Sequence, residues 1–272
     1  MNIVDLTPEQ LRQFIREHHE NTYLLIDVRQ PGEYENGHIP GSHLMPLPRL
    51  IQDMAALPRD KELIFYCHSG GRSIAAATMV ADEEVVHGNL YHLSGGMLAW
   101  DGAMTADFPR VQVFERYDTP SGMLRTAINL EKGALNFYIR VQIQHADQPW
   151  SKVFADLARA EMSHAKTIYQ FLREMDADVK PFETLFDSLP GDVLEGGTTL
   201  EEAIRQAASV EKRVCLRLVE LALRIEYAAF DLYRTMADQI LAPDVREAFM
   251  GIAQAEKGHM LALTRAVENC PR

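Results

Sequence analysis

The sequence predicts two domains: an α/β domain with a mainly parallel sheet, followed by an all-α four-helix bundle with one long crossover. Three observations support this. Residues 1–108 alternate short apolar runs with amphipathic segments, as βα units do. Residues 123–272 have a helical pattern and contain a repeat at a fixed offset of 95 residues, which indicates a duplicated helical hairpin. Residues 109–122 hold two prolines and a glycine and are predicted to be a linker.

The α/β domain is predicted to contain an early helix, because Thr7 is a typical N-cap, Pro8 suits the first helical position and Gln10 completes a capping box. Four apolar runs are expected to be strands, near residues 23–27, 43–45, 62–66 and 90–93. The residues that follow such a strand lie at the carboxyl edge of the sheet, where open sheets bind ligands.

The strand at 62–66 is followed at once by the loop Cys67-His68-Ser69-Gly70-Gly71-Arg72-Ser73 and an alanine-rich helix start. A loop of this kind points backbone N–H groups, and the positive end of the helix dipole, at the sulfur. Arg72 adds a fixed positive charge. This environment is expected to lower the thiol pKa from about 8.5 and to generate a nucleophilic thiolate.

The loop resembles the Cys-x-x-Gly-x-Arg active-site loop of single-domain rhodaneses. Two further stretches agree: Asp-Val-Arg at 27–29 with Gly-His-Ile-Pro-Gly at 37–41, and Gly-Gly-x-x-x-Trp at 95–100. The resemblance covers nearly all of residues 1–108. It implies a sulfurtransferase in which the Cys67 thiolate takes sulfur from thiosulfate or a persulfide. The resulting Cys67 persulfide then passes the sulfur to a thiol, sulfite or cyanide.

On this resemblance Cys67 and Arg72 are catalytic. The expected substrate-binding residues are His68, Ser69, Gly70, Gly71, Ser73, Asp27 and Arg29. Asp27 and Arg29 have a purely structural alternative. A phosphatase loop is a second alternative for the motif, but that loop has five residues between Cys and Arg, whereas this one has four. An inert buried cysteine is the third.

The repeat in the second half duplicates residue types that bind metals. The pairs at the offset of 95 are Glu131 with Glu226, Tyr138 with Tyr233, Glu161 with Glu256, and His164 with His259. Each copy is broken once, at 145–149 and at 242–244, and its two glutamates lie about equally far from the break. They therefore occupy one level of an antiparallel hairpin, about 20 Å from its turn. Within each Glu-x-x-His the side chains share a helix face.

Packing the two hairpins together would bring four carboxylates and two imidazoles into one core. Buried carboxylates need cations or protons beside them, and this ligand set suits iron or manganese. A single Glu-x-x-His is more often a solvated helix face, but two copies favour a metal site. The set, over roughly residues 122–270, resembles the rubrerythrin branch of the ferritin-like family. That resemblance implies two iron ions, with manganese or zinc as alternatives, bound by Glu131, Glu161, His164, Glu226, Glu256 and His259.

The same resemblance implies that Tyr138 and Tyr233 hydrogen-bond the opposing carboxylates; a role as core residues is the alternative. Rubrerythrins that reduce peroxide often carry an extra glutamate where this chain has Ala229, and they commonly carry paired Cys-x-x-Cys motifs, which this chain lacks. These departures argue against peroxidase activity, and electrons would come from an external donor or from the first domain. Residues 176–198 hold too many glycines and prolines for one helix, a further helix is expected at 199–208, and residues 176–211 suggest no function.

Composition excludes several partners. The net charge is −12, with 8 Lys/Arg against 15 Asp/Glu in residues 1–110, which argues against nucleic acid and anionic membranes. No long apolar segment or signal peptide is evident, so a cytoplasmic protein is expected. Three cysteines predict no disulfide framework, and Cys215 and Cys270 are expected to be ordinary thiols.

Three functions fit these observations. The first is a sulfurtransferase fused to a di-iron domain with oxidase- or peroxidase-type redox activity. In the second the bundle only stores metal and mediates oligomerisation. The third is a redox sensor or carrier without turnover. A homodimer through the helical bundle is expected on resemblance.

Overall fold

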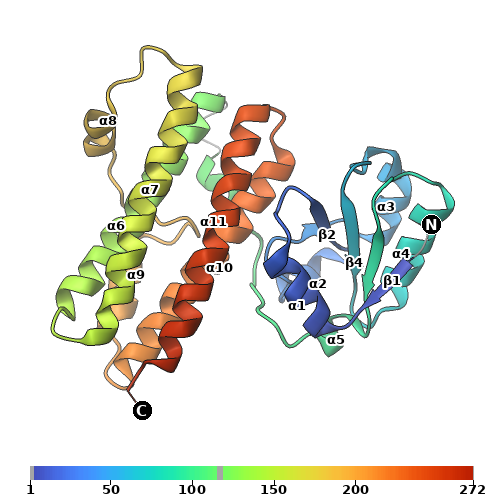
Figure 1. The fold of residues 1–272 in the computed structure, drawn as a ribbon, viewed down its shortest axis with the longest axis horizontal. Coiled ribbons are helices and arrows are strands. Elements are labelled where there is room, and N and C mark those ends of the chain that lie inside the picture. The colour runs from blue at the N-terminus through green and yellow to red at the C-terminus, as the bar shows by residue number, and fades with distance from the viewer. Residues whose placement is uncertain (1–2, 115–118, 272) are drawn as a thin grey trace. The chain divides into compact units, whose positions relative to one another are not determined.

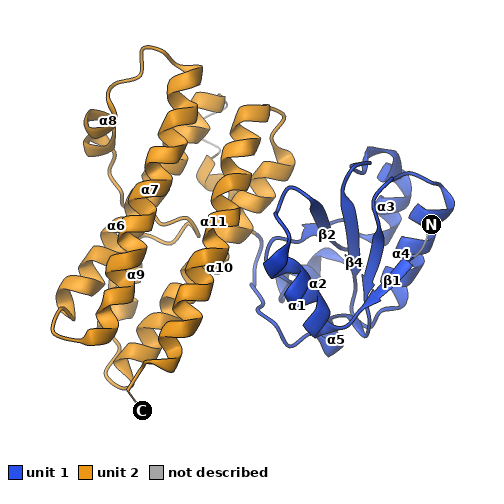
Figure 2. Cartoon of the chain, viewed as in Figure 1, with its two compact units in different colours: residues 1–108 blue, residues 109–272 orange. Residues whose placement is uncertain are grey.

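The computed structural model describes residues 3–114 and 119–271. The chain forms two compact units, residues 1–108 and residues 109–272 (Figure 2). The first is α/β and the second is helical, which confirms the fold class predicted from the sequence.

Unit 1 is built on a five-stranded sheet in which every neighbouring pair is parallel. Its strand order is β1-β5-β4-β2-β3. The strands are β1 (Ile3–Leu6), β2 (Tyr23–Asp27), β3 (His43–Leu44), β4 (Glu62–Tyr66) and β5 (Leu90–Leu93). The four strands expected from the sequence are present, and β1 is additional.

Helices cover both faces of this sheet (Figure 1). They are α1 (Pro8–Glu17), α2 (Pro31–Glu35), α3 (Leu47–Asp53), the 3₁₀ turn η1 (Met54–Ala56), α4 (Gly71–Asp82) and α5 (Gly96–Ala99). The expected capping box of α1 forms, with Thr7 Oγ1 accepting from the Gln10 N–H. Alternate strand residues enter two cores, since Leu24 and Phe65 belong to one and Leu25 and Ile64 to the other. Central strands buried on both faces explain the continuous apolar runs of the sequence.

Unit 2 is a four-helix bundle with accessory segments. Its elements are η2 (Val111–Phe114), α6 (Pro120–Gln144), η3 (Pro149–Ser151), α7 (Lys152–Met175), α8 (Phe182–Ser188), α9 (Leu200–Ala208), α10 (Val214–Gln239) and α11 (Pro243–Glu268). Helix α6 packs along α7, α10 packs along α11, and α7 contacts α11. The first hairpin break lies where the sequence places it, between α6 and η3, whereas the second comprises residues 240–242 rather than 242–244, because Pro243 is the first residue of α11. Helix α9 begins after its N-cap Thr199, as expected.

The segment expected as a linker is partly structured. Its residues 111–114 form η2, where Phe114 is buried against the ring of Phe249, and α6 begins at Pro120. Among the described residues no helix has the length and apolar character needed to cross a membrane.

The prediction that Cys215 and Cys270 are ordinary thiols is wrong. The two form a disulfide, with their Cα atoms 5.5 Å apart, a normal separation for such a bond. Antiparallel packing of α10 and α11 brings the first turn of α10 beside the residues that follow α11. Among the described residues Cys67 is the one free cysteine.

Candidate functional site

Cys67 lies between the end of β4 and the start of α4, at the carboxyl edge of the sheet. The backbone reverses at Gly70, whose φ of +98° favours glycine, and the Gly70 N–H donates to Cys67 Sγ at 3.1 Å. Burial disfavours the thiolate, but hydrogen bonds from the Ser73 side chain and from the amides of Ser73, Ser69 and Gly70 outweigh it. The pKa of the Cys67 thiol is therefore lowered.

The thiol is covered rather than exposed. Cys67 is 1% exposed, whereas His68, Ser69 and Gly71 of the same loop face solvent. Burial among apolar side chains would raise the thiol pKa, but the hydrogen bonds of this loop lower it.

The short helix α5 holds the backbone of the cysteine loop in place. The N–H groups of Met97 and Leu98 donate to the carbonyls of Cys67 and His68, at 2.8 and 3.0 Å. A Cβ on Gly96 would lie 2.3 Å from the Cys67 carbonyl oxygen. Glycine is required at 96 because two backbones meet there, which gives a physical reason for the Gly-Gly-x-x-x-Trp motif.

Arg72 is held by a partner that the sequence did not reveal. Its two terminal nitrogens donate to the two carboxylate oxygens of Glu33, each at 2.8 Å. The hydrogen bonds from Arg72 are the main cause that lowers the pKa of Glu33 to about 2. The guanidinium also interacts electrostatically with Cys67. Arg72 therefore contributes a positive charge near the sulfur that Glu33 partly compensates.

Asp27 and Arg29 form a buried ion pair. The Arg29 Nη2–Asp27 Oδ2 distance is 2.6 Å, and the same nitrogen donates to the Gly37 carbonyl at 2.8 Å. Both side chains are buried, at 0% and 4% exposure. These contacts tie the end of β2 to the turn at 37–41, and they supply a structural role for both residues.

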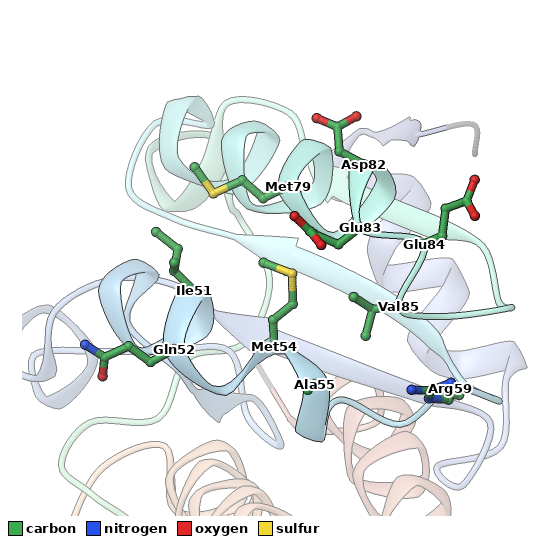
Figure 3. Close-up of a pocket in the computed structure, with 10 residues that line it drawn as sticks. All are labelled: Ile51, Gln52, Met54, Ala55, Arg59, Met79, Asp82, Glu83, Glu84 and Val85. Carbon is green, nitrogen blue, oxygen red and sulfur yellow. The ribbon is translucent and has the colours of Figure 1, made fainter.

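A surface hollow of about 880 Å³ lies elsewhere in unit 1 (Figure 3). It is lined by residues of α3, η1, the carboxyl end of α4 and the loops that follow η1 and α4, among them Met54, Arg59 and Met79. Cys67 precedes the opposite end of α4. None of the predicted sulfur-site residues lines this hollow.

In unit 2 the six predicted ligands come together from four helices. Helix α6 supplies Glu131, α7 supplies Glu161 and His164, α10 supplies Glu226, and α11 supplies Glu256 and His259. Each of the four carboxylates is at most 2% exposed. One chain therefore assembles the whole set.

Each histidine faces three carboxylates through its Nδ1 atom. His164 Nδ1 lies 3.3 Å from oxygens of Glu131, Glu161 and Glu256. His259 Nδ1 lies 2.9 Å from Glu226, 3.0 Å from Glu256 and 3.3 Å from Glu161. The two rings stack with centroids 4.8 Å apart. The donors thus surround two neighbouring positions, related by the internal repeat.

The two tyrosines link the hairpins across the cluster. Tyr233 donates to Glu131 Oε1 at 2.5 Å, and Tyr138 donates to Glu226 Oε1. Burial, followed by the charge of these carboxylates, raises the pKa of both tyrosines well above the ordinary value. Both therefore remain donors that orient a ligand oxygen.

The cluster contains more acceptors than partners. Among the described residues, buried atoms without a hydrogen-bond partner include Glu131 Oε2, Glu161 Oε2, His164 Nδ1 and both oxygens of Glu256. Such atoms are strongly unfavourable unless a cation binds them. Carboxylate oxygens with two imidazole nitrogens are the donors that iron and manganese accept. The residues present therefore fit a metal pair.

Protons take the place of cations when none is bound. Burial raises the pKa of Glu161 to about 8. For His259, burial lowers the pKa, but the carboxylates of Glu256, Glu226 and Glu161 outweigh it and raise the value to about 12. The pKa of His164 is raised in the same way, by the carboxylates of Glu131, Glu161 and Glu256. The cluster attracts positive charge.

One further carboxylate at this site was not predicted. Glu195, from the segment between α8 and α9, is 2% exposed. One of its oxygens lies within 4.8 Å of ligand atoms of Glu131 and Glu161. The segment has no helical period, so the repeat that identified the six ligands gives no signal for it.

Two protein families match the two units. The model of the rhodanese-like domain matches residues 7–103, and that of rubrerythrin matches residues 122–219. The rubrerythrin match includes Glu131, Glu161 and His164. The second set of ligands lies beyond it and is supplied by the repeat.

Curated relatives resemble this chain over about a third of its length. A sulfurtransferase of Allochromatium vinosum is 34% identical over 77 residues, covering 28% of this chain and 70% of its own. The protein YqhL of Bacillus subtilis is 38% identical over 82 residues, covering 30% and 64%. The probable adenylyltransferase/sulfurtransferase MoeZ of Mycobacterium tuberculosis is 35% identical over 104 residues, covering 38% and 26%. The chain therefore belongs to the rhodanese-like sulfurtransferases through its first unit and joins that unit to a rubrerythrin domain.

Proposed function

We propose that unit 1 carries sulfane sulfur as a persulfide of Cys67. The Cys67 thiolate attacks the outer sulfur of thiosulfate, the S–S bond of the donor breaks, and sulfite leaves with the bonding electron pair. The acceptor, a thiolate, sulfite or cyanide, then attacks the outer sulfur of the persulfide and regenerates the thiolate. Each step transfers one neutral sulfur atom, so no external oxidant is needed.

The loop contacts support this proposal. The Gly70 N–H already donates to Cys67 Sγ at 3.1 Å, and the hydrogen bonds of the loop favour a thiolate over a thiol. In a persulfide anion the negative charge lies on the outer sulfur, one atom beyond Cys67 Sγ. His68, Ser69 and Gly71 of the same loop are exposed, so we expect the outer sulfur to lie on their side of the loop. The Arg72 guanidinium supplies the positive charge that attracts an anionic donor.

Sulfur transfer from thiosulfate to cyanide tests this role. Cys67→Ser should abolish thiocyanate formation and prevent the gain of one sulfur atom in the mass of the protein. A variant with Cys215→Ser and Cys270→Ser retains Cys67 as its single cysteine and should keep the activity. Equal rates for wild type and Cys67→Ser would refute the assignment.

We further propose that unit 2 binds two metal ions, preferentially iron, with manganese or zinc as alternatives. Glu131, Glu161, His164, Glu226, Glu256 and His259 would hold them. Bound iron would supply redox chemistry toward oxygen or peroxide. The residues themselves orient the donors: Tyr233 fixes Glu131 and Tyr138 fixes Glu226. The single observation that carries this proposal is the set of buried acceptor atoms without partners.

Metal analysis and absorption spectroscopy test the second role. The purified chain should retain two metal ions, and the spectrum of the iron-loaded protein should change on reduction and again on exposure to oxygen. Two irons that stay spectrally silent through this cycle would refute redox activity and favour a storage module. The electron donor is proposed to be a separate protein, because the chain has no Cys-x-x-Cys pair. The chain is also proposed to be a cytoplasmic homodimer; a monomeric mass with metals bound would contradict the dimer.

A further inference from the structure

Glu195 lies at the tip of a short turn in the crossover between α8 and α9. The turn closes through an antiparallel bridge between Val193 and Thr199 and through a hydrogen bond from the Leu194 N–H to the Thr198 carbonyl, at 2.9 Å. The bridge and the backbone bond hold the two sides of the turn together, so the Glu195 side chain projects from a fixed frame.

The turn is fastened to α6, the helix that carries Glu131. A Cβ on Gly133 would lie 2.0 Å from the Val193 carbonyl oxygen, so the backbone of the turn lies directly on the helix at this glycine. Just before the turn, Gly191 donates to Asn129 Oδ1 at 2.8 Å and accepts from Asn136 Nδ2 at 3.1 Å. The sequence places a glycine and two asparagines along one helix where an irregular segment needs close approach and hydrogen-bond partners.

The carboxylate of Glu195 has no partner in another residue. Both oxygens are buried and make no hydrogen bond to any other residue that the structure describes, and the side chain is 2% exposed. Its neighbours are acidic, since one of its oxygens lies within 4.8 Å of ligand atoms of Glu131 and Glu161. A buried carboxylate beside two others is strongly unfavourable, unless a cation or a proton neutralises its charge.

We propose that Glu195 is a seventh metal ligand, a fifth carboxylate that binds the ion held by Glu131 and Glu161. This inference rests on the metal site proposed above and adds a ligand from outside the four helices. The internal repeat has no equivalent of Glu195 in the bundle, because the position 95 residues earlier is Trp100 of unit 1. The extra carboxylate therefore makes the two metal positions unequal.

Titration of the metal-free full chain with Co²⁺, followed by visible absorption, tests the inference. Wild type should bind two ions. Glu195→Ala should weaken one of them by about tenfold or more, because even partners that only orient a ligand are worth about 10–100-fold in affinity, and should leave the other unchanged. Glu202→Ala, an exposed glutamate in the first turn of α9, is the matched control and should bind like wild type.

Two further measurements distinguish the loss of a metal ligand from misfolding of the variant. Glu195→Gln keeps the shape of the side chain while removing its charge, and should also weaken one ion. Without metal, both variants should melt at a higher temperature than wild type, because a buried carboxyl group beside other carboxylates has been removed; with Co²⁺ they should gain less stability. Wild-type affinity for both ions in Glu195→Ala and Glu195→Gln would overturn the inference alone. Failure of wild type to bind Co²⁺ would overturn the metal site as well.

Discussion

Removal of the metal ions should make the stability of unit 2 fall steeply as the pH rises from 5 to 8. The reason is the pKa of Glu161, about 8 in the metal-free fold against an ordinary value of 4.5. Below pH 4.5 the folded and unfolded states both hold this proton, and the Glu161 carboxyl group does not reduce the stability. Above it the unfolded state releases the proton while the folded state keeps it, so stability is lost until the pH passes about 8.

The magnitude follows from the two pKa values. Their difference is equivalent to about 5 kcal/mol in total, of which about 3–4 kcal/mol is lost between pH 5 and pH 8. The raised pKa of His259, about 12, acts in the same direction above about pH 6.5. The lowered pKa of Glu256 acts below about pH 5, outside this window. Metal-bound ligands are deprotonated, so the loaded protein should not lose stability over this range.

Urea unfolding of chelated and metal-loaded protein at pH 5, 6, 7 and 8 measures the effect. The chain has two tryptophans, and Trp100→Phe leaves Trp150 as a fluorescence reporter of unit 2. Glu161→Gln removes the titrating group and should flatten the pH dependence of the metal-free protein by about 3 kcal/mol. Unfolding free energies of the chelated protein that stay constant or rise from pH 5 to 8 would refute the reasoning.

Three other changes have definite expected outcomes. Tyr138→Phe should weaken metal binding by about 10–100-fold in a metal titration, while the neighbouring control Tyr227→Phe should not; equal losses would argue against the hydrogen bond. Glu33→Gln releases Arg72 and should lower KM for thiosulfate by roughly fivefold, the effect of about 1 kcal/mol; a higher KM would show that Glu33 instead positions the arginine. Cys215→Ser opens a loop of 55 residues and should lower the urea stability of unit 2 by about 2–4 kcal/mol; an unchanged midpoint would show that the disulfide is dispensable.

The convergence of the six proposed metal ligands was predictable because regular helices turn sequence spacing into position. Once the breaks at 145–149 and 242–244 are located, residues equally far from a break must lie at one level of the hairpin. The same arithmetic applies to the disulfide, since Cys215 and Cys270 lie almost equally far from the second break. That signal is present in the sequence, although one cysteine within a helix and another near a frayed chain end predict ordinary thiols.

Features that do not follow a helical or strand periodicity in the sequence were not predictable in this way. Strand β1 has two exposed positions, Val4 and Asp5, because it lies at the edge of the sheet, and so it lacks the apolar run that marks β4. The ion pair of Arg72 with Glu33 joins two residues 39 positions apart in the sequence, one in the first turn of α4 and the other in α2. The position of Glu195 depends on the path of an irregular crossover. The sequence feature that relates to this path is Gly133, where the backbone of the crossover lies against α6.

The buried carboxylates also change the meaning of the net charge. Residues 111–272 hold 24 acidic against 19 basic residues, since the whole chain has 39 and 27 and residues 1–110 hold 15 and 8. The excess of five equals the number of carboxylates buried at the metal site: Glu131, Glu161, Glu195, Glu226 and Glu256. Acidic and basic residues elsewhere in this region balance. Its acidity is therefore a property of the interior, where the proposed metal ions would neutralise it, whereas the described part of residues 1–110, which has an excess of seven, contains no such cluster. The argument from charge against nucleic acid as a partner consequently rests on unit 1, and a partner of the bundle would meet a surface with little net charge.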